Sequence, residues 1–296
     1  MLRWRLLLGT LLVALVALLG WLDSRAMIPG VWLFPLALVA TLAATGEILW
    51  MLGDRPSRPV AWVALVGNAA IVSSNWLPFI SSYRIIWPGA QAIWASATLA
   101  LAVLLAFGSE IQRYRAPGIA TARLAATSLT FTYIGLMMSF VVQLRLLASG
   151  ALGVMVLVSL IMTVKLGDIG AYTVGRLIGR HRMAPLLSPG KTLEGAVGGL
   201  VFACFGAWLG LCVLWPLAST GLAEQFSAVH WLSYGVLVGL AGMFGDLAES
   251  LLKRDLGCKD SSPWLPGFGG VLDIIDSILL AAPPAFVWWL AMSRLS

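Results

Sequence analysis

Long apolar runs separated by short polar stretches dominate the pattern of this chain. Their lengths, with charged residues or proline and glycine clusters between them, predict nine membrane-spanning helices. These are expected near residues 5–22, 31–52, 60–80, 90–108, 124–147, 151–175, 193–217, 231–249 and 271–292. A run such as 6–22 is apolar on every face, whereas barrel strands alternate apolar and polar residues. The pattern therefore predicts an all-α polytopic membrane protein.

The composition supports the membrane class. Of the 296 residues, 60% are hydrophobic and 11% are charged, against about 25% charged residues in soluble domains. The longest predicted loops have about fifteen residues, so no soluble domain is expected. The distribution of ionisable groups divides the chain into two parts. Residues 1–150 hold spans one to five, and residues 151–296 hold spans six to nine and most ionisable groups near the bilayer.

Basic residues are distributed unequally over the predicted loops. Fourteen of the nineteen lysines and arginines fall on the side that holds the N-terminus, four fall on the other side, and Lys165 lies within a span. The positive-inside rule then places the N-terminus in the cytoplasm and the C-terminus outside. The net charge of +6 needs no nucleic-acid partner, and the expected location is the cytoplasmic membrane.

Acidic residues of the second half fall at one predicted depth, the cytoplasmic ends of four spans. They are Asp168, Glu194, Asp246, Glu249, Asp273 and Asp276. Charged groups in or beside a span are costly and are a functional signal by default. In the eighth span, Asp246, Glu249, Ser250 and Lys253 have the spacing of one helix face. Carboxylates without histidine or thiolate suit Mg²⁺, with room for a second cation.

The start of the seventh span carries candidate phosphate-binding groups. They are Ser188, Lys191, Thr192 and Glu194. A helix start attracts anions, although a simple capped helix start would also explain this stretch. A P-loop is not predicted, because Pro185 stands where its first glycine should be and no strand is expected before it.

The loop before the ninth span adds further polar groups. Residues 253–262 mix cations, acids and hydroxyls, and glycines follow at 267, 269 and 270. Metal-binding acids, cations and glycines together are typical of phosphoryl or nucleotidyl transfer. Acyl transfer is disfavoured, since His181 and His230 are the only histidines and neither has the setting of a general base.

The pattern of residues 250–276 resembles the signature of the phosphatidate cytidylyltransferase family, also called CDP-diacylglycerol synthases. It reads Ser250-Leu-Leu-Lys253-Arg254, then Lys259-Asp260-Ser261-Ser262, then Leu265-Pro266-Gly267-Phe268-Gly269-Gly270, with Asp273 and Asp276. The stretches 165–176 and 188–195 are similar to other stretches of that family. Two positions depart from the pattern: Phe268 replaces a histidine and Ile274 replaces an arginine.

The resemblance implies a reaction of CTP with phosphatidic acid that gives CDP-diacylglycerol and pyrophosphate at the cytoplasmic face. It also implies a homodimer. The implied metal ligands are Asp246, Asp273 and Asp276. The implied catalytic groups are these three acids with Lys253, Arg254, Lys259 and Asp260. The implied substrate contacts are Lys165, Asp168, Ser188, Lys191, Thr192, Glu194, Glu249, Ser250, Ser261, Ser262, Gly267, Gly269 and Gly270.

Three other functions stay open. A CTP-dependent lipid kinase, or a cytidylyltransferase for another lipid phosphate, would need similar residues. A secondary transporter would also carry intramembrane acids, but near the bilayer midplane on broken helices rather than at one face.

Overall fold

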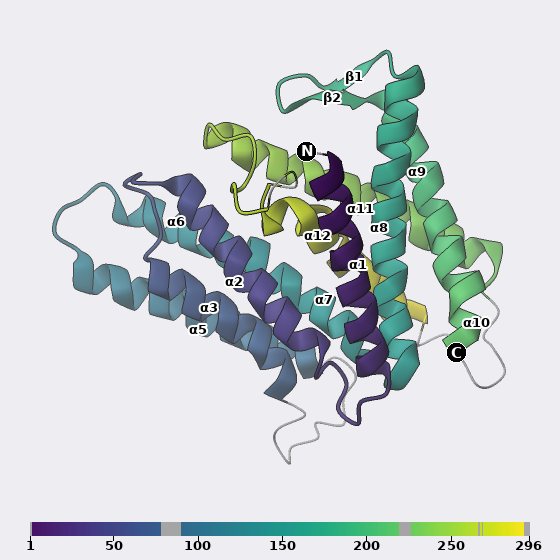
Figure 1. Ribbon diagram of the computed structural model, residues 1–296. Helices are drawn as coiled ribbons and strands as arrows, with labels where there is room; N and C mark the ends of the chain where they lie inside the picture. Colours follow the sequence, from purple (N-terminus) through teal and green to yellow (C-terminus); the bar gives the residue numbers. More distant parts are fainter. Residues whose placement is uncertain (1, 78–89, 219–225, 266, 268, 293–296) are drawn as a thin grey trace. The chain divides into compact units, whose positions relative to one another are not determined.

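Helices make up most of the computed structural model, which describes residues 2–77, 90–218, 226–265, 267 and 269–292 (Figure 1). Eight helices in this part are long and apolar enough to cross a membrane. Six are single helices: α1 (Leu2–Ser24), α2 (Leu33–Leu52), α5 (Ala90–Arg113), α8 (Gly150–Ile178), α11 (Ala228–Asp255) and α12 (Val271–Met292). The all-α polytopic class is therefore confirmed.

The other two spans contain π-helical turns. One consists of α6 (Ala120–Thr130), η2 (Phe131–Leu136) and α7 (Met137–Leu146). The second consists of α9 (Leu193–Trp208), η3 (Leu209–Leu214) and α10 (Trp215–Ala218). Both follow the predicted spans 124–147 and 193–217 within a few residues.

The predicted span at 60–80 differs from the other eight. Its described part is α3 (Ala61–Ser73), followed by the 3-10 turn η1 (Ser74–Trp76). At 13 residues, α3 falls short of the roughly 20 residues that cross a bilayer. Residues 78–89 lie outside the described part. Eight helices of spanning length are thus described where nine spans were predicted, and the orientation of the termini stays a prediction.

The chain forms two compact units that are interleaved along the sequence. The first contains Met1–Ala17, Gly30–Gln143 and Asp260–Ile274, and the second contains Leu18–Pro29, Leu144–Lys259 and Ile275–Ser296. These units are defined by contacts between residues and not by the positions of the candidate site residues. The predicted division at residue 150, which rests on the distribution of ionisable groups along the sequence, stays a prediction.

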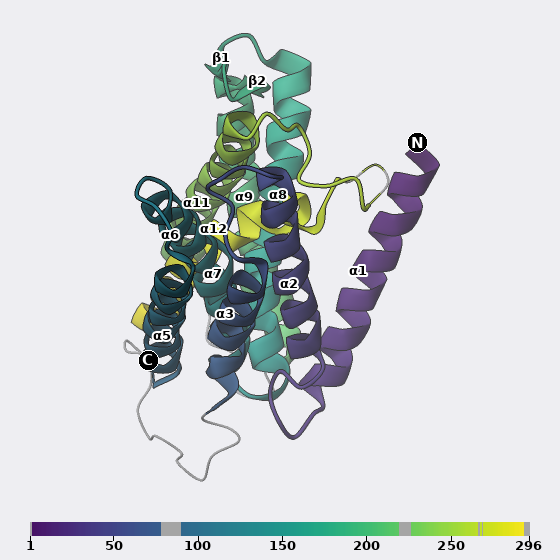
Figure 2. The same cartoon turned by 90° about the vertical axis from the view of Figure 1, so that its left-hand side faces the viewer.

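In the first unit, α3 lies between α2 and α5 (Figure 2). Val63 and Ile71 of α3 pack with Ala102 of α5 and Phe131 of η2 in a buried apolar cluster. A Cβ at Gly67 would overlap the Phe131 ring, so this close approach requires glycine. Apolar burial and close packing thus hold these short elements together.

In the second unit, α8 and α9 run side by side along much of their length (Figures 1 and 2). Small residues line their contact. A Cβ at Gly170 would overlap Phe202, and one at Gly199 would lie 3.0 Å from the Ala171 Cβ. Helices in membranes associate through such small residues, because lipid provides no hydrophobic driving force between them.

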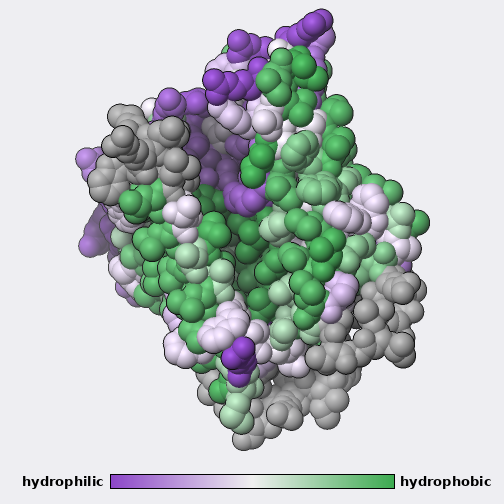
Figure 3. Space-filling view, turned by 45° about the vertical axis from the view of Figure 1, so that its right-hand side comes forward, coloured by the Kyte–Doolittle hydropathy of each residue, from purple (hydrophilic) through white to green (hydrophobic). Residues whose placement is uncertain are grey.

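A small β-hairpin joins α8 to α9. Its strands β1 (Arg182–Ala184) and β2 (Ser188–Thr192) pair antiparallel beyond the ends of both helices (Figure 1). Hydrophilic residues gather over this end of the second unit, and the helical surface next to it is mainly hydrophobic (Figure 3). The prediction that no strand precedes residues 190–192 is wrong; the P-loop stays rejected because its first glycine is missing.

A buried ion pair joins the end of α1 to the end of α7 within the second unit. Arg145 Nε donates to Asp23 Oδ2, and another guanidinium nitrogen donates to the Asp23 carbonyl. Asp23 is 0% exposed and Arg145 is 2% exposed. Since neither charge can reach water, each depends on its partner.

We expect Arg145→Met to lower the free energy of unfolding by about 3–5 kcal/mol, because the Asp23 carboxylate loses its cation while buried. Thermal unfolding of the purified protein in detergent measures this as a lower midpoint. The double variant Asp23→Leu/Arg145→Met should recover part of the loss, since it leaves no buried charge alone. A single variant that unfolds at the parental temperature would contradict the prediction.

Candidate functional site

Three carboxylates and two lysines gather in the second unit, and we call them the acid–lysine cluster. They come from three helices and β2: Lys165 and Asp168 from α8, Lys191 from β2, Asp246 from α11 and Asp276 from α12. Lys191 Nζ lies 2.7 Å from Asp246 Oδ2, and Lys165 Nζ lies 3.2 Å from Asp168 Oδ2. Asp276 interacts electrostatically with Asp246, Asp168 and Lys165. The structure therefore brings together five residues that the sequence analysis had selected.

A glycine contact places two of these acids next to each other. A Cβ at Gly245 would lie 2.8 Å from the Asp276 carbonyl oxygen and 3.0 Å from the Ser277 Cα. Only glycine lets α11 approach α12 this closely, and Asp246 and Asp276 are the acids at that crossing. Asp276 Oδ1 accepts from the backbone N–H of Ser277, which holds the carboxylate against its own helix.

The last turns of α11 hold four other candidates. Lys253 Nζ lies 2.6 Å from Glu249 Oε2, and Glu249 is 2% exposed. Ser250 is also buried. Arg254 Nε donates to the Leu187 carbonyl at 3.1 Å, which ties the hairpin loop to α11. Lys253 thus has a carboxylate partner, whereas Arg254 connects backbone segments.

The hairpin candidates have well-defined local roles. Thr192 is the N-cap of α9, and its Oγ1 accepts from the Gly195 N–H. Glu194 accepts from the backbone N–H groups of Arg180 and His181 and pairs with His181 Nδ1 at 2.6 Å. The capped helix start that the sequence left open is therefore present. These bonds hold the base of the hairpin, and with it Lys191.

The first unit holds the rest of the signature. Asp273 Oδ2 accepts from the N–H and Oγ of Ser261 and from the Gly270 N–H, at 2.7–2.9 Å. Ser262 donates its hydroxyl to Glu47. The sequence analysis assigned the two serines and Gly270 to substrate. Here they connect to acids of the protein itself.

Glycine conformation shapes the loop before α12. Gly267 and Gly269 have φ of +90° and +87°, which L side chains rarely adopt. A Cβ at Gly270 would overlap Ser261 Oγ and both Glu47 carboxylate oxygens. Lys259 and Asp260 are exposed just before this loop. Phe268, one of the two departures from the family pattern, lies outside the described residues.

Glu47 is the residue whose role the sequence did not reveal. It is the one acid within the predicted span 31–52, and its position in the sequence indicates no role. In the structure it is 0% exposed and accepts four hydrogen bonds from residues 261–272. An isolated acid in an apolar run was the available signal, but its partners lie more than 200 residues away.

The acids fit a magnesium ion by chemistry but are not arranged around one. Carboxylate oxygens are the ligands that Mg²⁺ prefers. Within the described ranges, no group of three or more His, Cys, Asp or Glu side chains could hold a metal ion. Asp246 and Asp168 face lysines instead. Asp273 belongs to the first unit and Asp246 and Asp276 to the second, so their joint metal site stays a prediction.

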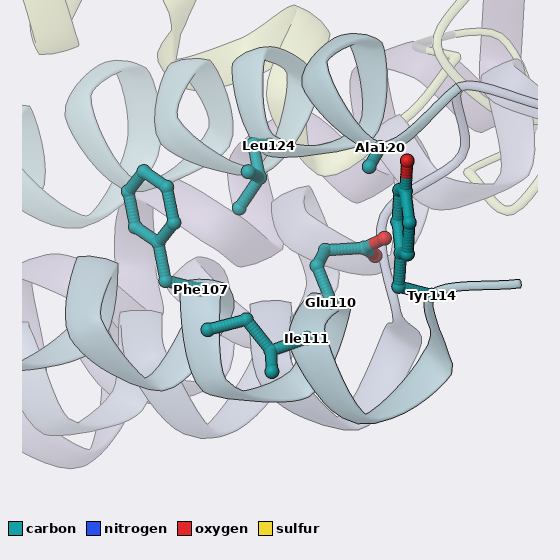
Figure 4. A pocket seen from close by; sticks show the side chains of 6 residues that line it. All are labelled: Phe107, Glu110, Ile111, Tyr114, Ala120 and Leu124. Carbon is teal, nitrogen blue, oxygen red and sulfur yellow. The ribbon is translucent and has the colours of Figure 1, made fainter. Parts of the chain in front are cut away.

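A separate pocket in the first unit contains none of the candidates. It lies between α5 and α6 and has a volume of about 260 Å³ (Figure 4). Phe107, Ile111 and Leu124 give it apolar walls. Its one acid, Glu110, is paired with Arg123 at 2.9 Å. Nothing in this lining resembles a phosphate site.

Comparisons with known proteins agree with the resemblance seen in the sequence. A phosphatidate cytidylyltransferase of Staphylococcus saprophyticus is 40% identical over 124 residues, which cover 41% of this chain and 44% of that protein. One of Haemophilus influenzae is 37% identical over 131 residues, 44% of each chain. The uncharacterized protein YnbB of Escherichia coli (strain K12) is 37% identical over 134 residues, 45% of this chain and 42% of YnbB.

The matched segments thus span less than half the length of these curated relatives. The model of the cytidylyltransferase family matches far more of the chain, residues 3–292. That match includes both compact units and every candidate residue described above. The chain therefore belongs to the cytidylyltransferase family.

Proposed function

We propose that this protein transfers the cytidylyl group of CTP to phosphatidic acid, giving CDP-diacylglycerol and pyrophosphate. The observation that carries the proposal is the acid–lysine cluster, in which cations and carboxylates from three membrane-spanning helices and the adjoining strand β2 meet. The named activity of the Staphylococcus and Haemophilus relatives agrees with it.

The chemistry needs charge neutralisation more than proton transfer. A phosphate oxygen of the lipid is already ionised at neutral pH and attacks the α-phosphorus of CTP directly. One P–O bond forms there, the bond to the bridging oxygen of the β-phosphate breaks, and pyrophosphate leaves with that electron pair. No strong general base is required. The main demands are in-line positioning and compensation of phosphate charge.

The cluster can compensate phosphate charge in two ways, through its lysines and through a metal ion bound to its acids. In the proposed complex Lys191 and Lys165 would neutralise phosphate oxygens, and Asp246 and Asp276 would hold Mg²⁺. A magnesium ion at these acids would supply further positive charge to the phosphates. The ion pair between Lys191 and Asp246 shows that the two groups are within reach of each other. The metal role of Asp273 and the phosphate roles of Lys253, Arg254 and Lys259 rest on the sequence pattern.

The proposed side of the membrane is the cytoplasmic one. CTP is a cytoplasmic solute, and the lipid substrate reaches the helices from within the leaflet. The unequal distribution of loop lysines and arginines supports this orientation.

The reaction class is tested by following isotopic label from CTP. Purified protein is incubated with phosphatidic acid in mixed micelles, Mg²⁺ and CTP labelled at either the α- or the γ-phosphate. We expect α-label in the lipid product and γ-label in pyrophosphate. Gamma-label in the lipid would show a lipid kinase instead, and activity only with another lipid phosphate would change the proposed acceptor.

We expect Asp246→Asn to lower kcat/KM by at least about 100-fold, because the neutral amide cannot balance a cation beside the phosphates. Asp255→Asn is the matched control, since Asp255 is exposed on the last turn of the same helix and lies outside the cluster. Steady-state CDP-lipid formation measures both variants. Equal rates in Asp246→Asn and the control would contradict the assignment.

Chelation tests the metal requirement. EDTA should abolish product formation and excess Mg²⁺ should restore it. We expect Asp276→Asn to raise the Mg²⁺ concentration at half-maximal rate by about tenfold or more, because a ligand oxygen loses its charge. A rate that is independent of Mg²⁺ in the parental protein would overturn the proposed cofactor.

A further inference from the structure

Glu47 forms an unusually complete set of hydrogen bonds inside the first unit. Its Oε1 accepts from Ser262 Oγ at 2.9 Å and from the Val271 N–H at 2.7 Å. Its Oε2 accepts from Ser261 Oγ and from the Leu272 N–H, both at 2.8 Å. Two donors on each oxygen match the four lone-pair sites of an ionised carboxylate.

These donors belong to one functional segment. Val271 and Leu272 open α12, and their N–H groups have no partner within the helix. The positive end of the helix dipole also favours a negative charge at this place. Ser261 and Ser262 precede the glycine loop. One buried side chain of α2 thus joins both ends of the segment 261–272.

The same bonds reach a predicted metal ligand. Ser261 Oγ lies 2.8 Å from Glu47 Oε2 and 2.7 Å from Asp273 Oδ2, so the two carboxylates share the single proton of this hydroxyl. Asp273 also accepts from the Gly270 N–H. A displaced Glu47 would therefore loosen the segment whose Ser261 and Gly270 donors hold the Asp273 side chain.

We propose that Glu47 is a positioning residue, which holds residues 261–272 and the first turn of α12 so that the Asp273 carboxylate is presented in one orientation. Its effect on catalysis rests on the proposed function, whereas its effect on the segment does not.

The chemical alternatives predict different substitution patterns. If Glu47 only fills space, the isosteric amide of Glu47→Gln should serve as well. If it acts as a hydrogen-bond acceptor, glutamine cannot replace it. In either orientation of the amide, the NH₂ group would face one serine hydroxyl and one backbone N–H that donate to Glu47. One backbone N–H at the start of α12 then loses its acceptor. Aspartate keeps the acceptor chemistry but is one methylene shorter.

The test is hydrogen–deuterium exchange of the full-length protein in detergent, read by mass spectrometry. For Glu47→Gln we expect amide exchange in residues 261–273 to rise by at least about tenfold, with no rise in the other helices. Glu47→Asp should keep more local protection than Glu47→Gln. Glu110→Gln is the matched control, because Glu110 is also buried in the first unit but pairs with Arg123 and touches none of this segment.

Activity is the second readout. We expect Glu47→Gln to lower kcat/KM for CDP-lipid formation by at least about tenfold, and Glu110→Gln to leave it unchanged. If the parental protein does not form CDP-lipid, the proposed function fails and the exchange result still decides the role of Glu47.

Three results would overturn the inference. They are unchanged exchange of the segment in folded Glu47→Gln, an equal rise over all helices, and better protection with glutamine than with aspartate. If Glu47→Gln does not fold, Ser262→Ala replaces it, since it removes one donor of the four. A smaller rise in amide exchange, confined to residues 261–273, is then expected. The absence of any local rise in this variant would overturn the inference.

Discussion

A carboxylate inside a membrane protein must receive its partners from the protein, because the lipid core offers neither water nor donors. This requirement explains the main polar contacts of the structure. Asp23 receives a guanidinium, Glu249 an ammonium group and Glu47 four neutral donors. Each of these contacts joins either two segments that are distant along the chain or two adjacent turns of one helix. The hydrogen-bonding needs of a few buried acids thus constrain where helices begin and which loops are fixed in position.

Fully buried and partly buried charges have different consequences for function. A buried ion pair such as Asp23–Arg145 has both charges satisfied and serves the fold. The acid–lysine cluster is only partly buried: the Asp246 side chain is 39% exposed, whereas Lys191 Nζ and Asp276 are buried. Groups that still reach solvent can exchange partners with an incoming ligand at lower cost. The cluster is therefore better suited to bind phosphate and a cation than the fully buried pairs are.

Glycine is the second recurring requirement. Gly245 allows α11 to approach α12 at the cluster, and Gly270 leaves room for Glu47 and Ser261. In both places the missing side chain brings acids and backbone close together. Gly270 of the signature loop thus has a structural reason in the protein itself, besides the substrate contact that the resemblance implies.

The sequence alone determined the membrane class, eight of the helices within a few residues, and the family. Hydropathy over about twenty residues is a local property, and the signature at 250–276 is contiguous, so both can be read without a fold. The pairing of Lys191 with Asp246, the hairpin between α8 and α9, and the role of Glu47 depended on the tertiary structure. Glu47 lies 214 residues before Ser261, and no local pattern specifies such a partner. Only folding decides which donors reach a buried acid, because close packing, not sequence spacing, brings those groups together.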